Sequence, residues 1–205
     1  MKLYDSRRAP NPRRVRWFMA EKGIENIEVI DVDLFKGEHR EAGYLAKTGA
    51  ANVPALEIDD DLTITESLAI CRYLESLYSE PNMFGRDPRE TAVIEMWTRR
   101  AEMLLATPLM MTVRHSHPAL AALETQVPEV AENNRGSATK ALKFFDRRLG
   151  ESPFIAAERV TIADIVAAIS FDFAKMARFA IPEEFENLIR WRTEMLDRPA
   201  AKAGV

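Results

Sequence analysis

Hydrophobic and polar residues follow two different periods in the first third of the chain. Residues 28–32 alternate polar and apolar side chains, which predicts a strand, whereas Val15, Phe18 and Met19 repeat at helical spacing. Three aspartates at 59–61 separate two short apolar runs, as in a β-hairpin. The predicted order is therefore β-α-β-α-β-β-α. Strands are expected at residues 2–4, 28–32, 55–58 and 62–64, and helices at about 10–22, 41–47 and 68–77.

The pattern changes after Tyr78. Residues 79–88 are rich in proline, glycine and small polar residues, which predicts a linker. Beyond them the strand alternation stops, and helices are predicted at 88–113, at 129–149, after Thr161 and between 182 and 197. The sequence thus predicts an α/β domain at residues 1–78, a linker at 79–88 and an all-α domain at 89–205.

Composition narrows the classes of protein that this chain can belong to. A net charge of −4 argues against nucleic-acid binding, because neutralising phosphates needs a basic surface. The single cysteine, Cys71, excludes an internal disulfide and fits a reducing compartment. Residues 1–5 read as a strand rather than a signal peptide, and apolar runs never reach the roughly 18 residues that a membrane span needs. A cytoplasmic protein that binds no membrane is expected.

The dipeptide Val53-Pro54 stands directly before an apolar strand. Proline cannot donate to a sheet ladder, so it belongs at the start of a strand or in a special turn. A cis bond here would turn the backbone of Val53 outward and offer its N–H and C=O to an extended peptide, as in β-strand addition. An ordinary trans proline that opens a strand is the alternative.

Glu66 and Ser67 lie between the predicted hairpin and the next helix. Ser67 can present its hydroxyl and N–H at a helix N-terminus, where the helix dipole favours an anion. Glu66 can pair with an ammonium group. Together they would recognise the carboxylate and amine of an α-amino acid, while simple helix capping is the alternative.

These motifs, in this order, resemble those of the cytosolic glutathione transferase family. Asn52-Val53-Pro54 resembles the family's cis-proline loop, and Glu66-Ser67 resembles its γ-glutamyl-binding pair. Thr161-Ile162-Ala163-Asp164 resembles the Ser/Thr-x-x-Asp motif of the family's helical domain, which is physically a capping box. The resemblance covers both predicted domains. It implies a thioredoxin-like N-terminal domain followed by an all-α domain, which is the glutathione transferase fold.

The resemblance also implies the ligands. Glutathione would be the co-substrate, with Val53 and Pro54 at its cysteinyl backbone and Glu66 and Ser67 at its γ-glutamyl end. His39 and Asn52 would face the glycyl carboxylate, with Lys36 as a further candidate, and a solvated loop is the alternative for this segment. The second substrate would be a small hydrophobic electrophile. A homodimer without a metal is implied.

The group that activates the thiol is not evident from the sequence. Ala9 stands where many family members carry serine or cysteine, and Tyr4 lies in the first strand, where a structural role is the favoured interpretation. Asn11 can donate a hydrogen bond toward the sulfur, with plain helix capping as the alternative. The pattern Phe35-Lys36-Gly37-Glu38-His39 resembles an atypical fungal and bacterial subgroup that lacks the usual catalytic Tyr, Ser or Cys.

In that subgroup a water held by the helical domain is thought to assist the thiol. His115 is the candidate to hold such a water or act as a base, because imidazole titrates near neutrality. A histidine that ends a helix and is bonded locally is the alternative. Other functions remain open: a glutathione-dependent peroxidase, or a non-catalytic member that binds glutathione or another ligand. Cys71 shares a helix stripe with leucines and is expected to be buried and inert.

Overall fold

The computed structural model describes residues 1–203, whose contacts divide the chain into two compact units. The first unit contains residues 1–81 together with 202–203, and the second contains residues 82–201. Each unit has its own core and is described by itself.

A four-stranded mixed sheet forms the centre of the first unit. Its strands are β1 (Lys2–Asp5), β2 (Glu28–Asp31), β3 (Ala55–Glu57) and β4 (Thr63–Thr65). They are ordered β2-β1-β3-β4, with β1 parallel to β2 and the other two pairs antiparallel. The predicted strands are confirmed to within one residue at each end.

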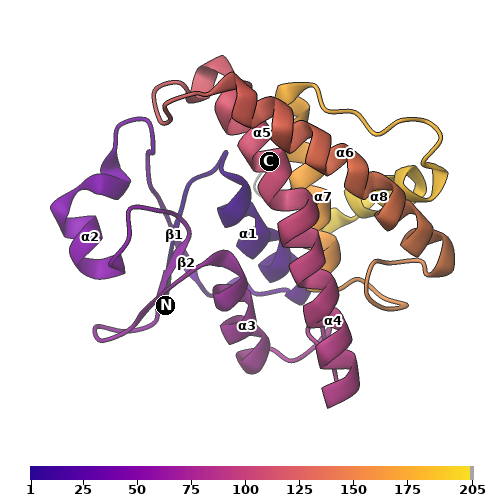
Figure 1. The fold of residues 1–205 in the computed structure, drawn as a ribbon. Helices are drawn as coiled ribbons and strands as arrows, with labels where there is room; N and C mark the ends of the chain where they lie inside the picture. The colour runs from indigo at the N-terminus through magenta and orange to yellow at the C-terminus, as the bar shows by residue number, and fades with distance from the viewer. Residues whose placement is uncertain (204–205) are drawn as a thin grey trace. The chain divides into compact units, whose positions relative to one another are not determined.

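Three helices and one helical turn complete this unit: α1 (Pro10–Lys22), the 3₁₀ turn η1 (Glu38–Arg40), α2 (Ala42–Thr48) and α3 (Ser67–Leu77). Helices α1 and α3 pack against each other, and α2 lies on the other side of the sheet (Figure 1). Proline opens α1, since its fixed φ suits a first turn, and Gly23 ends it at φ 63°. The predicted order β-α-β-α-β-β-α is confirmed.

Apolar side chains fill the space between the sheet and these helices. Leu3, Val15, Phe18 and Leu56 are fully buried, and Cys71 on α3 is buried with them. Burial raises the pKa of the Cys71 thiol, so this side chain stays protonated and unreactive. The predicted inert cysteine is confirmed.

The second unit is all-helical (Figure 1). Its main helices are α4 (Pro88–Ala101), α5 (Thr107–Ser116), α6 (Pro128–Glu151), α7 (Ile162–Ala174) and α8 (Glu186–Asp197). Short 3₁₀ segments lie at η3 (Pro118–Leu120), η4 (Lys175–Ala177) and η5 (Pro199–Lys202), and the last residue of η5 is already assigned to the first unit. Helix α7 contacts α4, α5 and α8, and every one of its residues from Ile162 to Phe171 is buried.

The helix predicted at 88–113 is interrupted. A π-helical turn, η2 (Glu102–Ala106), separates α4 from α5, and Pro108 follows it at the start of α5. Pro108 has no N–H, and its ring would clash with the carbonyl of residue 104 in a regular α-helix. The wider π turn fits this proline into a continuous helical path, and the prediction of one uniform helix was wrong here.

The N-terminus of α7 contains the predicted capping box, which is confirmed. The Asp164 carboxylate accepts hydrogen bonds from the N–H and hydroxyl of Thr161, at 2.9 and 2.8 Å. It also accepts from the N–H of Ile155 and from Trp191 Nε1, at 2.8 and 2.9 Å. Asp164 is completely buried, so one carboxylate joins the start of α7, the preceding loop and α8.

No helix within residues 1–203 is both long enough and apolar enough to cross a membrane.

We expect Asp164→Ala to lower the free energy of unfolding by about 3 to 5 kcal/mol, because it leaves several buried donors without an acceptor. Urea denaturation followed by circular dichroism measures the loss. Asp197→Ala, which removes an exposed carboxylate at the end of α8, is the matched control and should change stability little. Equal stability of the two variants would contradict this role for Asp164.

Candidate functional site

The strand register brings four loop segments of the first unit to one edge of the sheet. Tyr4 near the end of β1 pairs with Ile30 of β2 and with Ala55 of β3, and Ala55 pairs with Thr65 of β4. The chain therefore leaves β1, β2 and β4, and enters β3, at the same edge. Ligands of open α/β sheets commonly bind beyond such strand ends.

The segment that enters β3 carries the cis bond expected from the sequence. Val53-Pro54 is cis, and Val53 is only 9% exposed. Within residues 1–203 the backbone N–H and C=O of Val53 form no hydrogen bond. The hydroxyl of Tyr44 donates to the carbonyl oxygen of Asn52 at 2.5 Å and so fixes the preceding residue. Both polar backbone groups of Val53 remain available to an extended peptide.

The segment that leaves β4 becomes the N-terminus of α3. Glu66 is the N-cap residue and has φ 67°, a left-handed value that is uncommon for a residue other than glycine. Backbone outliers of this kind cluster at functional sites. The Glu66 side chain is exposed and has no hydrogen-bond partner in the part of the chain that the structure describes. Its carboxylate is therefore open to a cation from solution.

Ser67 follows Glu66 and begins α3. It is 5% exposed, and its Oγ accepts a hydrogen bond from Nη1 of Arg14 at 3.4 Å. Arg14 is itself only 3% exposed, so a buried guanidinium lies beside the N-terminus of α3. This contact joins α1 to α3 at the point where Glu66 and Ser67 are presented.

The segment that leaves β1 leads into α1. Ala9 packs against a small buried cluster that includes Tyr4, Val53 and Ala55. Residues 10 and 12 are prolines, and the N–H of Arg13 bonds to the carbonyl of Ala9, at 3.3 Å. The N–H of Asn11 is therefore the free backbone donor of this helix's first turn among the described residues.

The side chain of Asn11 adds a second unused group at this place. Its Oδ1 is buried, and no described residue donates a hydrogen bond to it. A buried polar atom without a partner costs roughly 1–3 kcal/mol, so such an atom points to a ligand or water that completes the site. Two contacts join the start of α1, which carries Asn11, to the other segments of this edge. Ala9 packs against Val53, and Arg14 bonds to Ser67.

The hydroxyl of Tyr4 is engaged elsewhere. It donates to Oε2 of Glu57 at 2.6 Å and accepts from Nζ of Lys47 at 3.1 Å. Lys47 Nζ also donates to Oε2 of Glu57 at 3.0 Å. The hydrogen bonds that Glu57 accepts, first from Tyr4 and then from Lys47, lower its pKa to about 2. Tyr4 is 8% exposed and its ring belongs to the cluster around Val53. The contacts favour the structural interpretation of this tyrosine.

His39 lies in η1, on the segment that follows β2. It is 6% exposed, and its Nδ1 is buried without a hydrogen-bond partner in the described part of the chain. Burial, followed by the charge of Arg40, lowers the pKa of His39, so the imidazole is neutral at neutral pH. The segment is held by the N–H of Asp33, which bonds to Glu38 Oε2 at 2.7 Å, and by Leu34, which packs against the Val53 cluster.

The sequence pattern assigned no role to two arginines, which belong to a basic run made up of Arg7, Arg8, Arg13, Arg14 and Arg16. Runs of this kind are usually solvated faces. Arg14 contacts Ser67, as described, and Arg16 pairs with the carboxylate of Asp5 and donates to the carbonyl of Arg7 at 2.8 Å. Helical spacing could have revealed the burial of Arg14, because this residue precedes Phe18 by one turn on the buried face of α1.

His115, the histidine predicted to assist the chemistry, lies in the second unit near the end of α5. It is 8% exposed, and its Nδ1 accepts a hydrogen bond from the N–H of Val127 at 3.2 Å. This bond is the local bonding weighed against a catalytic role, and it leaves Nε2 as the protonated nitrogen. The catalytic role stays a prediction.

No group of three His, Cys, Asp or Glu side chains that could hold a metal ion occurs among the described residues.

We expect Tyr4→Phe to move the pKa of Glu57 upward from about 2 toward its ordinary value of 4.5, because the largest stabilising bond is removed. Carboxyl NMR titration measures the change. The stability that Glu57 adds to the wild-type protein is present above pH 4.5 and is lost as the pH falls toward 2, and this loss should shrink in the variant. Tyr78→Phe, which removes a bond to Asn26, is the control. An unchanged Glu57 titration would refute the assignment.

Comparison with known proteins gives consistent matches over the whole chain. Residues 9–77 match the family model of the glutathione S-transferase N-terminal domain, and residues 101–199 match that of the C-terminal domain. Glutathione S-transferase 2 of Saccharomyces cerevisiae is 34% identical over 98% of this chain and 88% of its own. Human glutathione S-transferase theta-2 is 33% identical over 88% of this chain and 75% of its own.

Solved structures show the same similarity. The crystal structure of Gtt2 from Saccharomyces cerevisiae aligns with this chain over 100% of both chains, with a TM-score of 0.92 at 34% identity. That of a Gtt2-class glutathione S-transferase from Vibrio parahaemolyticus covers 100% of this chain and 97% of its own, with a TM-score of 0.87 at 30% identity.

Proposed function

Because the chain belongs to the glutathione S-transferase family, we propose that its reaction takes place at the sheet edge of the first unit and joins the glutathione thiolate to a small hydrophobic electrophile. Transfer of glutathione is the activity of this enzyme, and the electrophile and the residues that act are the proposal. One observation carries it: the backbone of Val53 and the carboxylate of Glu66, both without a hydrogen-bond partner within residues 1–203, lie at one edge of one sheet.

The γ-glutamyl end of glutathione is proposed to bind at the N-terminus of α3. Its carboxylate would accept hydrogen bonds from the N–H and hydroxyl of Ser67, where the helix dipole and the guanidinium of Arg14 both favour negative charge. Its ammonium group would pair with Glu66. The exposed Glu66 side chain and its left-handed backbone support this arrangement.

The cysteinyl part of glutathione is proposed to pair with Val53, as a short added strand. Pro54 holds this residue at the entrance to β3, and the hydrogen bond from Tyr44 to Asn52 limits the movement of the loop. The glycyl carboxylate is assigned to His39 and Asn52. A neutral imidazole whose buried Nδ1 has no partner among the described residues supports a hydrogen-bonding role for His39.

The thiol is proposed to be activated at the N-terminus of α1 by Asn11. Thiolate rather than thiol is the nucleophile, and helix N-termini lower a thiol pKa. Ala9 has neither hydroxyl nor thiol, and the hydroxyl of Tyr4 is used by Glu57, which supports Asn11 as the donor. Each unit by which the pKa falls below about 8.5 corresponds to roughly 1.4 kcal/mol of thiolate stabilisation.

Partners and location complete the proposal. The enzyme is proposed to form a homodimer in the cytoplasm. Phe35 and Met103 are 58% and 69% exposed in the single chain, and aromatic residues and methionine are enriched in interfaces, which supports a dimer. A single buried cysteine that cannot form an internal disulfide supports a reducing compartment.

We expect Glu66→Gln to weaken glutathione binding about tenfold to a hundredfold, because a hydrogen bond to a charged group contributes about 1.5–3 kcal/mol. Isothermal calorimetry measures the dissociation constant. Glu41→Gln is the matched control, since Glu41 is another exposed helix N-cap without a side-chain bond. Equal affinities of the two variants would remove Glu66 from the site, and no binding heat for the wild-type protein would overturn the binding site as a whole.

We expect Asn11→Ala to raise the pKa of enzyme-bound glutathione by about one unit from a wild-type value below 8.5, because a donor near the sulfur is lost. Thiolate absorbance at a series of pH values measures it. Tyr4→Phe should leave this pKa unchanged.

A third variant separates the two candidate activators. His115→Asn keeps an acceptor for the N–H of Val127 but removes the imidazole. A rise in the thiol pKa in this variant and not in Asn11→Ala would transfer the role to His115. A wild-type value equal to that of free glutathione would favour a non-catalytic binding protein instead.

A further inference from the structure

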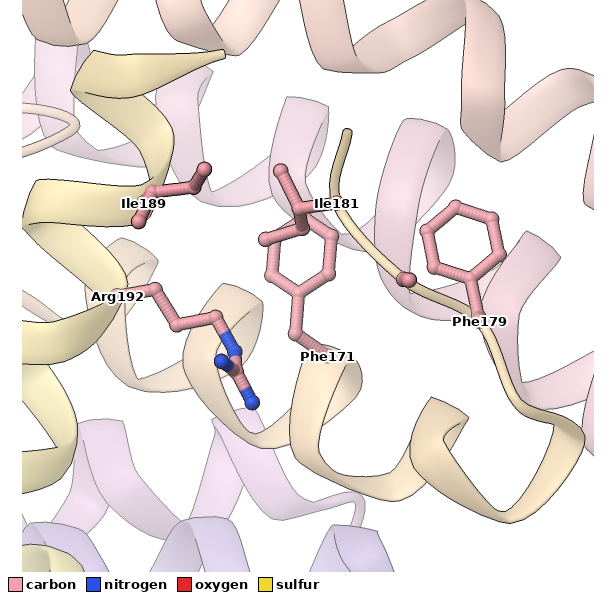
Figure 2. Close-up of a pocket in the computed structure, with 6 residues that line it drawn as sticks. Phe171, Phe179, Ile181, Ile189 and Arg192 are labelled. Carbon is pink, nitrogen blue, oxygen red and sulfur yellow. The ribbon is translucent and has the colours of Figure 1, made fainter. Parts of the chain in front are cut away.

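The second unit contains a cavity that the proposed reaction does not use. It lies between the end of α7, the segment 178–185 and α8, and has a volume of about 370 Å³ (Figure 2). Its lining residues are Phe171, Phe179, Ala180, Ile181, Ile189 and Arg192. Small-molecule sites are typically of this size and this composition, apolar with one or a few polar groups.

The walls of this cavity are fixed by contacts within the second unit. Phe171 is 2% exposed and packs edge-on against Trp191, with ring centroids 6.4 Å apart. Phe179 donates its N–H to the carbonyl of Ala174 at 3.1 Å, and the guanidinium of Arg135 lies 5.8 Å from its ring. The site is therefore formed before any ligand enters, which reduces the entropy lost on binding.

Arg192 is the charged residue of the cavity. It lies one turn after Ile189 on α8, and Figure 2 shows both side chains extending from that helix toward Phe171 and Ile181. Arg192 is partly buried, and within residues 1–203 it forms neither an ion pair nor a hydrogen bond. A guanidinium that is partly withdrawn from water beside apolar walls favours an anion as its partner.

We propose that this cavity binds a small organic anion with an aromatic or branched apolar body. The carboxylate or sulfonate would accept two parallel hydrogen bonds from Arg192, and the body would lie against Phe171 and the two isoleucines. Free phosphate would leave the apolar walls unused, and a neutral hydrocarbon would leave the guanidinium without a partner. All lining residues belong to the second unit, so the proposal does not rest on the glutathione site.

Calorimetry with naphthoate tests the charge. We expect naphthoate to bind the wild-type protein. It should bind Arg192→Gln at least about tenfold more weakly, because this variant loses a charge-assisted pair. Arg147→Gln is the matched control, because Arg147 is an exposed arginine of α6. This variant should bind naphthoate as tightly as the wild type does. Naphthylmethanol, which has the same body without the charge, should bind the wild type as weakly as naphthoate binds Arg192→Gln.

Methyl NMR tests the location in the presence of saturating glutathione. We expect naphthoate to shift the δ1-methyl signals of Ile181 and Ile189, assigned through Ile181→Val and Ile189→Val, at the concentrations that give the calorimetric signal. Shifts confined to other isoleucines would overturn the proposal, as would equal affinities of Arg192→Gln and Arg147→Gln. Absence of any heat with naphthoate would overturn it too.

Discussion

The pairing of β3 between β1 and β4 is the constraint on which the candidate site depends. This strand is only three residues long, yet Ala55 and Leu56 are fully buried and Ala55 is paired on both sides, with Tyr4 and Thr65. A slip by one residue would turn Leu56 from the core to the opposite face, so burial fixes the register. The same register brings the start of α1, the cis-proline loop and the start of α3 to one edge.

Charge is placed at this edge from within the protein. Arg14 gives up nearly all its contact with water to lie beside Ser67, and withdrawing a guanidinium from water is costly unless polar groups receive it. The position therefore adds positive potential to the N-terminus of α3, where the helix dipole already favours an anion. The neighbouring charges are paired within the protein. Arg16 forms an ion pair with Asp5, and Glu57 is bound by Tyr4 and Lys47.

Much of this architecture could be predicted from the sequence, because it rests on local patterns. Alternation located the second strand, and short apolar runs bounded by polar residues located the other three. The capping box of Thr161 and Asp164 depends on its own residue types, whereas the cis bond of Val53-Pro54 was expected through the family resemblance. The π turn before Pro108 was missed, although a proline inside a helical pattern is its physical cause. Long-range contacts were out of reach. Arg14 and Tyr4 donate to Ser67 and Glu57, each 53 residues further along the chain, and the cavity around Arg192 depends on how α7 and α8 pack.

The first turn of α1 is the place where, under the proposed mechanism, Asn11 would take over the role of the serine or cysteine that Ala9 lacks. A helix N-terminus ordinarily offers several free N–H groups, but prolines at 10 and 12 remove two of them, and Arg13 bonds to Ala9. The backbone N–H of Asn11 remains, next to a side-chain amide whose oxygen is buried and has no partner in the described part of the chain. Because Ala9 cannot donate, the proposal assigns both donors for a developing thiolate, the backbone N–H and the side-chain Nδ2 group, to Asn11. The prolines also fix the backbone of that turn, so Asn11 is held in place before a ligand binds, and little ordering is needed when it does.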